Sequence, residues 1–355
     1  VEGIMPQTIE HIEIINLLGI KDLILTITKS DLVTKEELEI QKKKTLEFLS
    51  DFDFDIKFVQ EVSIFEPKSI EALKNNLFTI KNSSKQEENF FRYYVDRVFS
   101  PKGIGTIVTG TILGKKLELN EKVFVCEAGK ESKIKNIQVH NENALEANNS
   151  NRAALNLQGF NSTNIKRGDL ITRKGFIRGF DEIDISFKAL KGKKLHHNKS
   201  YTIFIGAKKI EAKVLLFNST EDLDSGFATI KAEENLFTIF GEKLIIRQGN
   251  HTISGGKVLN PIIDPMKKNQ KKKLLEFLNE NNFEEAYYQL LQAHKKGLGI
   301  ISSAQRFALS HAEAISFAKN LKNVFVDEKE LVIYPIETKD LIVNSIREIY
   351  TKNTY

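Results

Sequence analysis

The 355-residue sequence is nearly free of cysteine, and no stretch of it is both long and apolar. Its single cysteine, Cys126, excludes an internal disulfide framework and a multi-cysteine zinc site, and it favours a reducing compartment. No run approaches the roughly 18 apolar residues of a membrane span, and no targeting peptide is visible at the N-terminus. We therefore expect a cytoplasmic protein that does not contact a membrane.

A strong charge asymmetry and a metal-binding cluster are also missing. The chain carries 52 Lys and Arg against 47 Asp and Glu, and this excess is too small to establish nucleic-acid binding. His196 and His197 are adjacent, so on a strand they would face opposite sides, and no carboxylate cluster follows them. We expect no metal site.

The first 80 residues follow the order helix, strand, helix, strand, helix, which is typical of a parallel sheet covered by helices. Thr34 and Glu37 have the spacing of a capping box before the second helix, and Pro67 begins the third. Two strands are too few for such a sheet. Residues 1–80 are therefore interpreted as the C-terminal part of an α/β domain whose first strands are missing.

After the polar stretch 81–89, which we interpret as a linker, the apolar period changes to two and turn residues separate short runs. Residues 90–178 and 180–264 are each predicted to form a small β-barrel. Helical periodicity then returns and is followed by strand-like residues, which predicts an α/β winged helix over 266–335. A further helix over 336–355 is expected to start a second winged helix, so the fold class is multidomain.

The segment "TITKSD" places Thr28, Lys29 and Asp31 at the carboxyl end of a buried strand, where open parallel sheets bind ligands. The Asp31 carboxylate could accept two parallel hydrogen bonds from guanine, whereas adenine would face it with an acceptor. The methylene stem of Lys29 could lie along the base. The alternative is a strand end followed by a helix-capping loop, and these residues alone do not decide between the two.

Three segments, "TKSD", "EVSIFEPKSIEAL" and "FFRYYVDRVFSPKGIGTIVTGTILGKK", resemble the translational GTPases, and in particular the selenocysteine-specific elongation factors. The resemblance covers nearly the whole chain. It implies a guanine site formed by Thr28, Lys29, Asp31 and Ser63, with GTP and GDP as ligands and Mg²⁺ expected in the full-length protein. Thr28 stands where the family motif usually has asparagine. The usual small residue and lysine after the serine are replaced by Ile64 and Phe65, which makes Ser63 the weaker match.

The resemblance also implies an aminoacyl pocket in the first barrel, formed by Asp96, Arg97 and Arg152. A selenol is ionised at neutral pH whereas serine is neutral, so two guanidinium groups can recognise selenium by its charge. Asp96 would hold the α-amino group. The alternative is a structural salt bridge at the rim of the barrel. In "YYVDRVF" strict alternation would put Asp96 and Arg97 on opposite faces, so one of them must depart from it unless the strand lies at an edge or rim.

The glycine-rich phosphate loop of GTPases and the switch sequence with its catalytic histidine are absent from the sequence. "SGGK" (254–257) lacks the first glycine and the hydroxyl residue of that loop, since His251 and Val258 stand there. We therefore expect an internal fragment that lacks the phosphate-binding half of the GTPase domain and the last winged-helix domains. Such a chain would have no catalytic residue and would be inactive alone.

The implied function is delivery of selenocysteinyl-tRNA to the ribosome at recoded UGA codons, with GTP hydrolysis by the full-length protein. The partners would be selenocysteinyl-tRNA, the ribosome and a selenoprotein mRNA hairpin bound through C-terminal winged helices. Two alternatives remain open. The chain could be a general aminoacyl-tRNA carrier or an initiation-type GTPase, or it could be a non-enzymatic RNA-binding adaptor that naturally lacks the phosphate loop.

Overall fold

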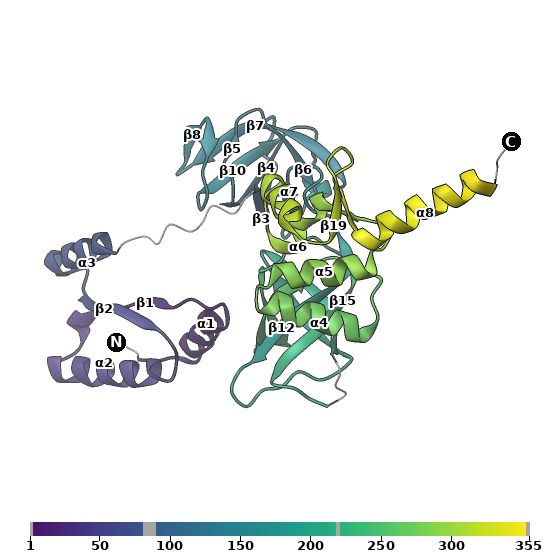
Figure 1. Ribbon diagram of the computed structural model, residues 1–355. Coiled ribbons are helices and arrows are strands. Elements are labelled where there is room, and N and C mark those ends of the chain that lie inside the picture. Colours follow the sequence, from purple (N-terminus) through teal and green to yellow (C-terminus); the bar gives the residue numbers. More distant parts are fainter. Residues whose placement is uncertain (1–2, 81–89, 218–220, 353–355) are drawn as a thin grey trace.

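The computed structural model describes residues 3–80, 90–217 and 221–352, and the linker predicted at 81–89 lies outside them (Figure 1). The N-terminal part contains five regular elements and one short 3-10 helix: α1 (Pro6–Leu17), β1 (Asp22–Thr28), η1 (Ser30–Leu32), α2 (Lys35–Leu49), β2 (Asp55–Val62) and α3 (Pro67–Thr79). Strands β1 and β2 pair in parallel, as the sequence predicts. The capping box of Thr34 and Glu37 is present at the start of α2.

The first barrel follows, and its strands alternate between buried and exposed residues as a closed sheet requires. Its elements are β3 (Arg92–Phe99), β4 (Thr106–Leu113), β5 (Leu117–Glu118), β6 (Lys122–Val125), β7 (Lys130–Val139), β8 (Glu142–Ala144), β9 (Glu146–Ala147), β10 (Arg152–Leu157), η2 (Ser162–Asn164) and β11 (Leu170–Thr172). Six strands run in the order β10-β4-β3-β11-β6-β7, and the pairing of β10 with β7 closes them.

The second barrel is a closed sheet of six strands in the order β12-β15-β14-β13-β16-β17. Its strands are β12 (Phe180–Ala189), β13 (Lys199–Ile205), β14 (Lys208–Leu216), β15 (Ser225–Leu236), β16 (Lys243–Gln248) and β17 (His251–Asn260). The "SGGK" segment lies within β17, far from any strand-to-helix turn, which confirms that it is no phosphate loop. Both predicted barrels are therefore confirmed as six-stranded.

The C-terminal region is mainly helical and carries a three-stranded antiparallel sheet in the order β18-β20-β19. Its elements are α4 (Lys268–Asn279), α5 (Phe283–Ala293), β18 (Leu298–Gly299), η3 (Ile300–Ser302), α6 (Ser303–Phe307), α7 (His311–Asn320), β19 (Val324–Asp327), β20 (Val332–Pro335) and α8 (Ile336–Lys352). Helices followed by a strand hairpin are the order that the winged-helix prediction requires. In Figure 1, α8 extends away from the rest of this region.

The helical region is joined to the second barrel and to the linker between the barrels by polar contacts around one side chain. Gln305 of α6 accepts a hydrogen bond from the Arg178 backbone N–H (3.1 Å) and donates to the carbonyls of Arg178 and Thr238 (2.8 Å each). Its own carbonyl accepts from the Phe240 N–H (3.0 Å). Because Arg178 lies between the barrels and Thr238 belongs to the second, one glutamine ties three segments together.

The two barrels meet around a buried lysine. Lys208 at the start of β14 contacts the carboxylates of Glu127 (3.4 Å) and Glu234 (3.2 Å). Burial raises the pKa of Glu127, and the charge of Lys208 opposes that rise. The N-terminal part reaches the second barrel through α1, where Glu10 accepts hydrogen bonds from Arg247 (2.7 Å) and Thr252 (3.0 Å).

No helix in the three described ranges is long and apolar enough to cross a membrane. Within the same ranges, no group of three or more His, Cys, Asp or Glu side chains is arranged to hold a metal ion. The His196 Nδ1 atom lies 2.7 Å from the Asp222 carboxylate, and the His197 ring accepts a hydrogen bond from the Leu216 N–H (3.1 Å).

Candidate functional site

The residues predicted to bind guanine gather at one edge of the parallel β1–β2 pair. Thr28 ends β1 and pairs with Val62, the last residue of β2, so the loops that follow the two strands lie side by side. Lys29 has a left-handed backbone (φ 58°), and both its side chain and that of Asp31 are exposed. Neither makes a hydrogen bond or ion pair within the part of the chain described. Both are therefore available to a ligand.

Ser63 differs from these residues because it is buried and already bonded. Its hydroxyl accepts a hydrogen bond from the Phe65 N–H (3.1 Å), and the Ser69 hydroxyl lies within 3.2 Å of its backbone. The two residues that depart from the family motif, Ile64 and Phe65, are largely exposed. Ser63 therefore shapes the loop after β2, and its hydroxyl is used within that loop.

Asp96 is the extra, unpaired residue of a β-bulge in strand β3 of the first barrel. On β3, Val95 pairs with Gly110 and Arg97 pairs with Thr109, so Asp96 has no partner in the ladder. A bulge places one extra residue in a strand and re-aims the side chains around it. The sequence predicted a departure from alternation at Asp96 and Arg97, and the bulge is its cause.

The Tyr93 ring packs against Gly110, the residue that pairs with Val95 beside the bulge, and only glycine leaves room for it there. A Cβ atom at Gly110 would lie 2.2 Å from the Tyr94 carbonyl oxygen and 2.9 Å from the Tyr93 ring, closer than real atoms approach. The buried Tyr93 hydroxyl lies 3.0 Å from the Val108 carbonyl and 2.9 Å from the Ala153 carbonyl. It thus links β4 to β10 directly beside Arg152.

Asp96 and Arg152 are in contact across this surface. The Arg152 guanidinium donates to the Asp96 carboxylate at 2.7 Å, although the Arg152 side chain is 62% exposed and that of Asp96 is 31% exposed. Arg152 pairs with Thr111 and Arg97 pairs with Thr109 on the same strand, β4. Residues two apart share a face, so both arginines lie on one face of the sheet. The Arg97 side chain is exposed and forms no hydrogen bond or ion pair with another described residue.

Sequence reasoning missed two polar residues on this face. The Thr109 Oγ1 and Asn156 Oδ1 atoms are buried and have no hydrogen-bond partner among the described residues, while the Asn156 amide donates to the Ile104 carbonyl (3.0 Å). Asn156 is four residues after Arg152 on β10, and this even spacing on a strand places it on the same face. That spacing was the signal in the sequence. Together these residues form a polar surface of mixed charge beside the bulge.

Two protein-family models match the chain. The GTP-binding domain of elongation factor Tu matches residues 1–162, and the β-barrel domain of the selenocysteine-specific elongation factor matches residues 182–264. A selenocysteine-specific elongation factor from Desulfomicrobium baculatum is 29% identical over 279 residues, and one from Haemophilus influenzae is 30% identical over 286 residues. The matches cover 76% and 78% of this chain, which spans 44% of the length of each relative.

A solved structure gives the same result over the whole chain. The crystal structure of a bacterial selenocysteine-specific elongation factor superposes with a TM-score of 0.82 at 26% identity. The match covers 100% of this chain and 58% of that one.

The match to residues 1–162 concerns the prediction that half of the GTPase domain is missing from the chain. It begins at the first residue of the chain, so it does not support the prediction that the phosphate-binding half of the GTPase domain is missing, nor the prediction that the chain is inactive. The prediction of a missing half rested on the absent phosphate-loop and switch motifs and on the presence of only two strands, and the structure pairs only β1 with β2 in this part of the described chain. The two family models and the superposition agree: the chain is similar in sequence and in fold to the selenocysteine-specific elongation factors, which are translational GTPases.

Proposed function

We propose that the protein carries selenocysteinyl-tRNA to the ribosome at recoded UGA codons and uses GTP to control its release. The main observation in support is the Asp96–Arg152 pair at the β3 bulge, with Arg97 free on the same face. This surface lies in the barrel next to the one that matches the selenocysteine-specific model.

The chemistry of the pair suits an aminoacyl group with an ionised side chain. A selenolate carries a negative charge at neutral pH, so Arg97 and Arg152 would bind it and would gain little from a neutral serine hydroxyl. Asp96 would accept hydrogen bonds from the α-ammonium group of the amino acid. Because Arg152 is largely exposed, its guanidinium can turn from Asp96 to the ligand without disturbing the core.

The loops after β1 and β2 are the proposed guanine site. Asp31 would accept the ring N–H and the amino group, the Lys29 stem would cover one face of the base, and Thr28 and Ser63 would maintain the loops around it. The free carboxylate of Asp31 fits this role. When bound, Mg²⁺ would neutralise charge on the phosphates of GTP.

The remaining partners follow from the same proposal. The ribosome would receive the tRNA, and winged-helix domains, of which 266–335 would be the first and 336–355 the start of the next, would bring the protein to an mRNA hairpin. Such a factor acts in the cytoplasm.

The experiment is a comparison of Arg152→Ala with the unchanged protein for binding of selenocysteinyl-tRNA and seryl-tRNA. A charged hydrogen bond contributes roughly 1.5 to 3 kcal/mol, so the affinity for selenocysteinyl-tRNA should fall about ten- to a hundredfold while that for seryl-tRNA changes little. Arg173→Ala is the matched control, because Arg173 forms an ion pair with Glu121 in the same barrel. Equal changes in both affinities for Arg152→Ala would instead favour a general aminoacyl-tRNA carrier.

A further inference from the structure

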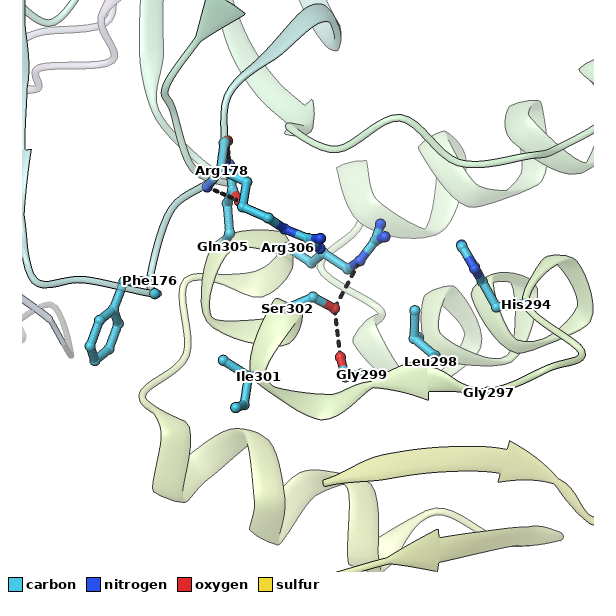
Figure 2. Close-up of a pocket in the computed structure, with 11 residues that line it drawn as sticks. Phe176, Arg178, His294, Gly297, Leu298, Gly299, Ile301, Ser302, Gln305 and Arg306 are labelled. Carbon is cyan, nitrogen blue, oxygen red and sulfur yellow. Dashed lines mark hydrogen bonds between the residues drawn. The ribbon is translucent and has the colours of Figure 1, made fainter. Parts of the chain in front are cut away.

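We propose that a cavity between the inter-barrel linker and the helical region binds a phosphate group, supplied by an RNA backbone. The cavity has a volume of about 400 Å³, at the small end of the range for ligand pockets. Figure 2 shows its walls: Phe176 and Arg178 from the linker, and His294, Ser302, Gln305 and Arg306 from the helical region. None of these residues belongs to the proposed guanine or aminoacyl sites.

The two charged residues that line the cavity, Arg178 and Arg306, are both basic. Arg178, His294 and Arg306 are its ionisable lining residues, and no carboxylate lines it. Lys295 and Lys296 directly follow His294, are exposed, and form no ion pair within the described ranges. An anion is therefore the class of ligand that this surface favours.

The backbone of Arg178 is held by hydrogen bonds to Gln305, whereas its guanidinium group is not hydrogen-bonded within the described residues. Gln305 binds both its N–H (3.1 Å) and its carbonyl (2.8 Å), whereas its side chain is exposed and forms no hydrogen bond or ion pair with the described residues. In Figure 2 the side chain extends toward Arg306. A guanidinium presented from an anchored backbone is suited to bidentate binding of a phosphate.

Arg306 is buried and held in one orientation. Its two terminal nitrogens donate to the Asp264 carboxylate at 2.7 and 2.6 Å, and its Nε donates to Ser302 at 3.3 Å. A guanidinium has five N–H groups, so two remain for a ligand. Asp264 balances the charge of Arg306, whereas Arg178 lines the cavity without an ion-pair partner among the described residues.

Two sources could supply a phosphate: an RNA backbone or a small phosphate compound. The open position between a barrel linker and the helical region, together with the lysines on one side, favours an extended polyanion. Contacts of this kind position an RNA without reading its sequence.

The test compares Arg178→Ala with Arg167→Ala, since Arg167 is another exposed arginine without a contact in the described residues and does not line the cavity. Binding of a fluorescent RNA duplex is measured across salt concentrations, and the melting temperature is measured with and without inorganic pyrophosphate. Arg178→Ala should lower the slope of log K against log salt by about one and abolish the shift with pyrophosphate. Arg167→Ala should leave the pyrophosphate shift unchanged. Arg178→Lys should keep the salt dependence but bind the RNA less tightly, because lysine lacks the two parallel N–H donors with which a guanidinium binds a phosphate.

The outcomes separate the two sources and the proposed function. Loss of the pyrophosphate shift with an unchanged RNA slope would overturn the RNA source and assign the site to a small phosphate compound. Unchanged results in both measurements, or equal losses in the Arg167 variant, would overturn the site itself. Arg178→Ala should preserve the discrimination between selenocysteinyl- and seryl-tRNA, and Arg152→Ala should preserve the pyrophosphate shift, so either proposal can fail alone.

Discussion

The hydroxyl of Tyr93 connects two strands beside the Asp96–Arg152 pair. Burial raises its pKa well above the ordinary value, and the Asp96 carboxylate raises that pKa further, so the hydroxyl stays protonated and donates throughout the physiological range. Its proton is shared between the Val108 and Ala153 carbonyls, which hold β4 against β10. The Tyr93 hydroxyl thus supports the strand from which the Arg152 side chain projects.

Tyr93→Phe should test whether the Tyr93 hydroxyl positions Arg152 for ligand binding in addition to stabilising the barrel. Removing the hydroxyl should destabilise the protein by about 1 kcal/mol, because the buried hydrogen bonding to two carbonyls is lost, and it should reduce discrimination between selenocysteinyl- and seryl-tRNA. Tyr201→Phe is the matched control, since the buried Tyr201 hydroxyl accepts from His196 N–H (2.9 Å) in the other barrel. Urea unfolding and tRNA binding are measured for both. Equal discrimination in the two variants would limit Tyr93 to a structural role.

At the scale of elements, Ala308 lies between α6 and α7 in a backbone conformation that is unfavourable for alanine. Ala308 follows α6 with φ 55° and ψ 37°, in the left-handed region that disfavours residues with a Cβ atom. Ser310 then begins α7 with a capping box to Glu313. The chain therefore turns sharply between two helices whose sequence is continuous in helical period.

Ala308→Gly should stabilise the protein because glycine adopts this backbone without strain. The expected gain is about 0.5 to 1 kcal/mol, reduced by the greater freedom of glycine in the unfolded chain. A thermal melt measures it. The same change at Ala314, which is buried in the middle of α7, is the control and should destabilise the protein. A lower melting temperature for Ala308→Gly would show that the left-handed backbone is not strained.

Local signals predicted most elements, and long-range contacts account for what they missed. The capping box at Thr34, Pro67 and the period-two runs are read from a few neighbouring residues, and the structure confirms the elements that they predicted. The bulge at Asp96 depends on the register between β3 and β4, which Gly110 and Tyr93 determine by packing. The alternation of side chains along the strand showed that Asp96 or Arg97 must depart from the regular pattern, but it could not predict that a β-bulge is the cause.

The joint between the second barrel and the helical region was also invisible to sequence reasoning, because its members are far apart in the chain. Asp264 accepts hydrogen bonds from Arg306 (2.7 and 2.6 Å) and contacts His294 (2.8 Å). Burial alone would raise the pKa of Asp264. The hydrogen bond to His294 and the charge and hydrogen bonds of Arg306 outweigh burial and lower that pKa to about 2.

Acid should therefore weaken this joint. A carboxyl group whose pKa falls from 3.8 unfolded to about 2 folded contributes about 2 kcal/mol of stability above pH 4, and that contribution is lost as the pH falls from 4 to 2. Asp264→Asn should remove this part of the pH dependence and destabilise the protein at pH 7. Urea unfolding at several pH values measures both effects. Asp22→Asn, at an exposed ion pair with Lys57, is the control and should change little. An unchanged pH profile for Asp264→Asn would contradict the stabilising role of Asp264.

At the scale of the whole molecule, the Gln305 contacts have a mechanical consequence. Turning α6 away from the barrels would break hydrogen bonds to Arg178, Thr238 and Phe240 at once, at a combined cost of about 2 to 6 kcal/mol, several times the thermal energy. We therefore expect the helical region to turn together with the second barrel and the linker to the first barrel. A pull on the far end, at α8, would reach the Asp96–Arg152 surface as a change of angle without any change in its local geometry.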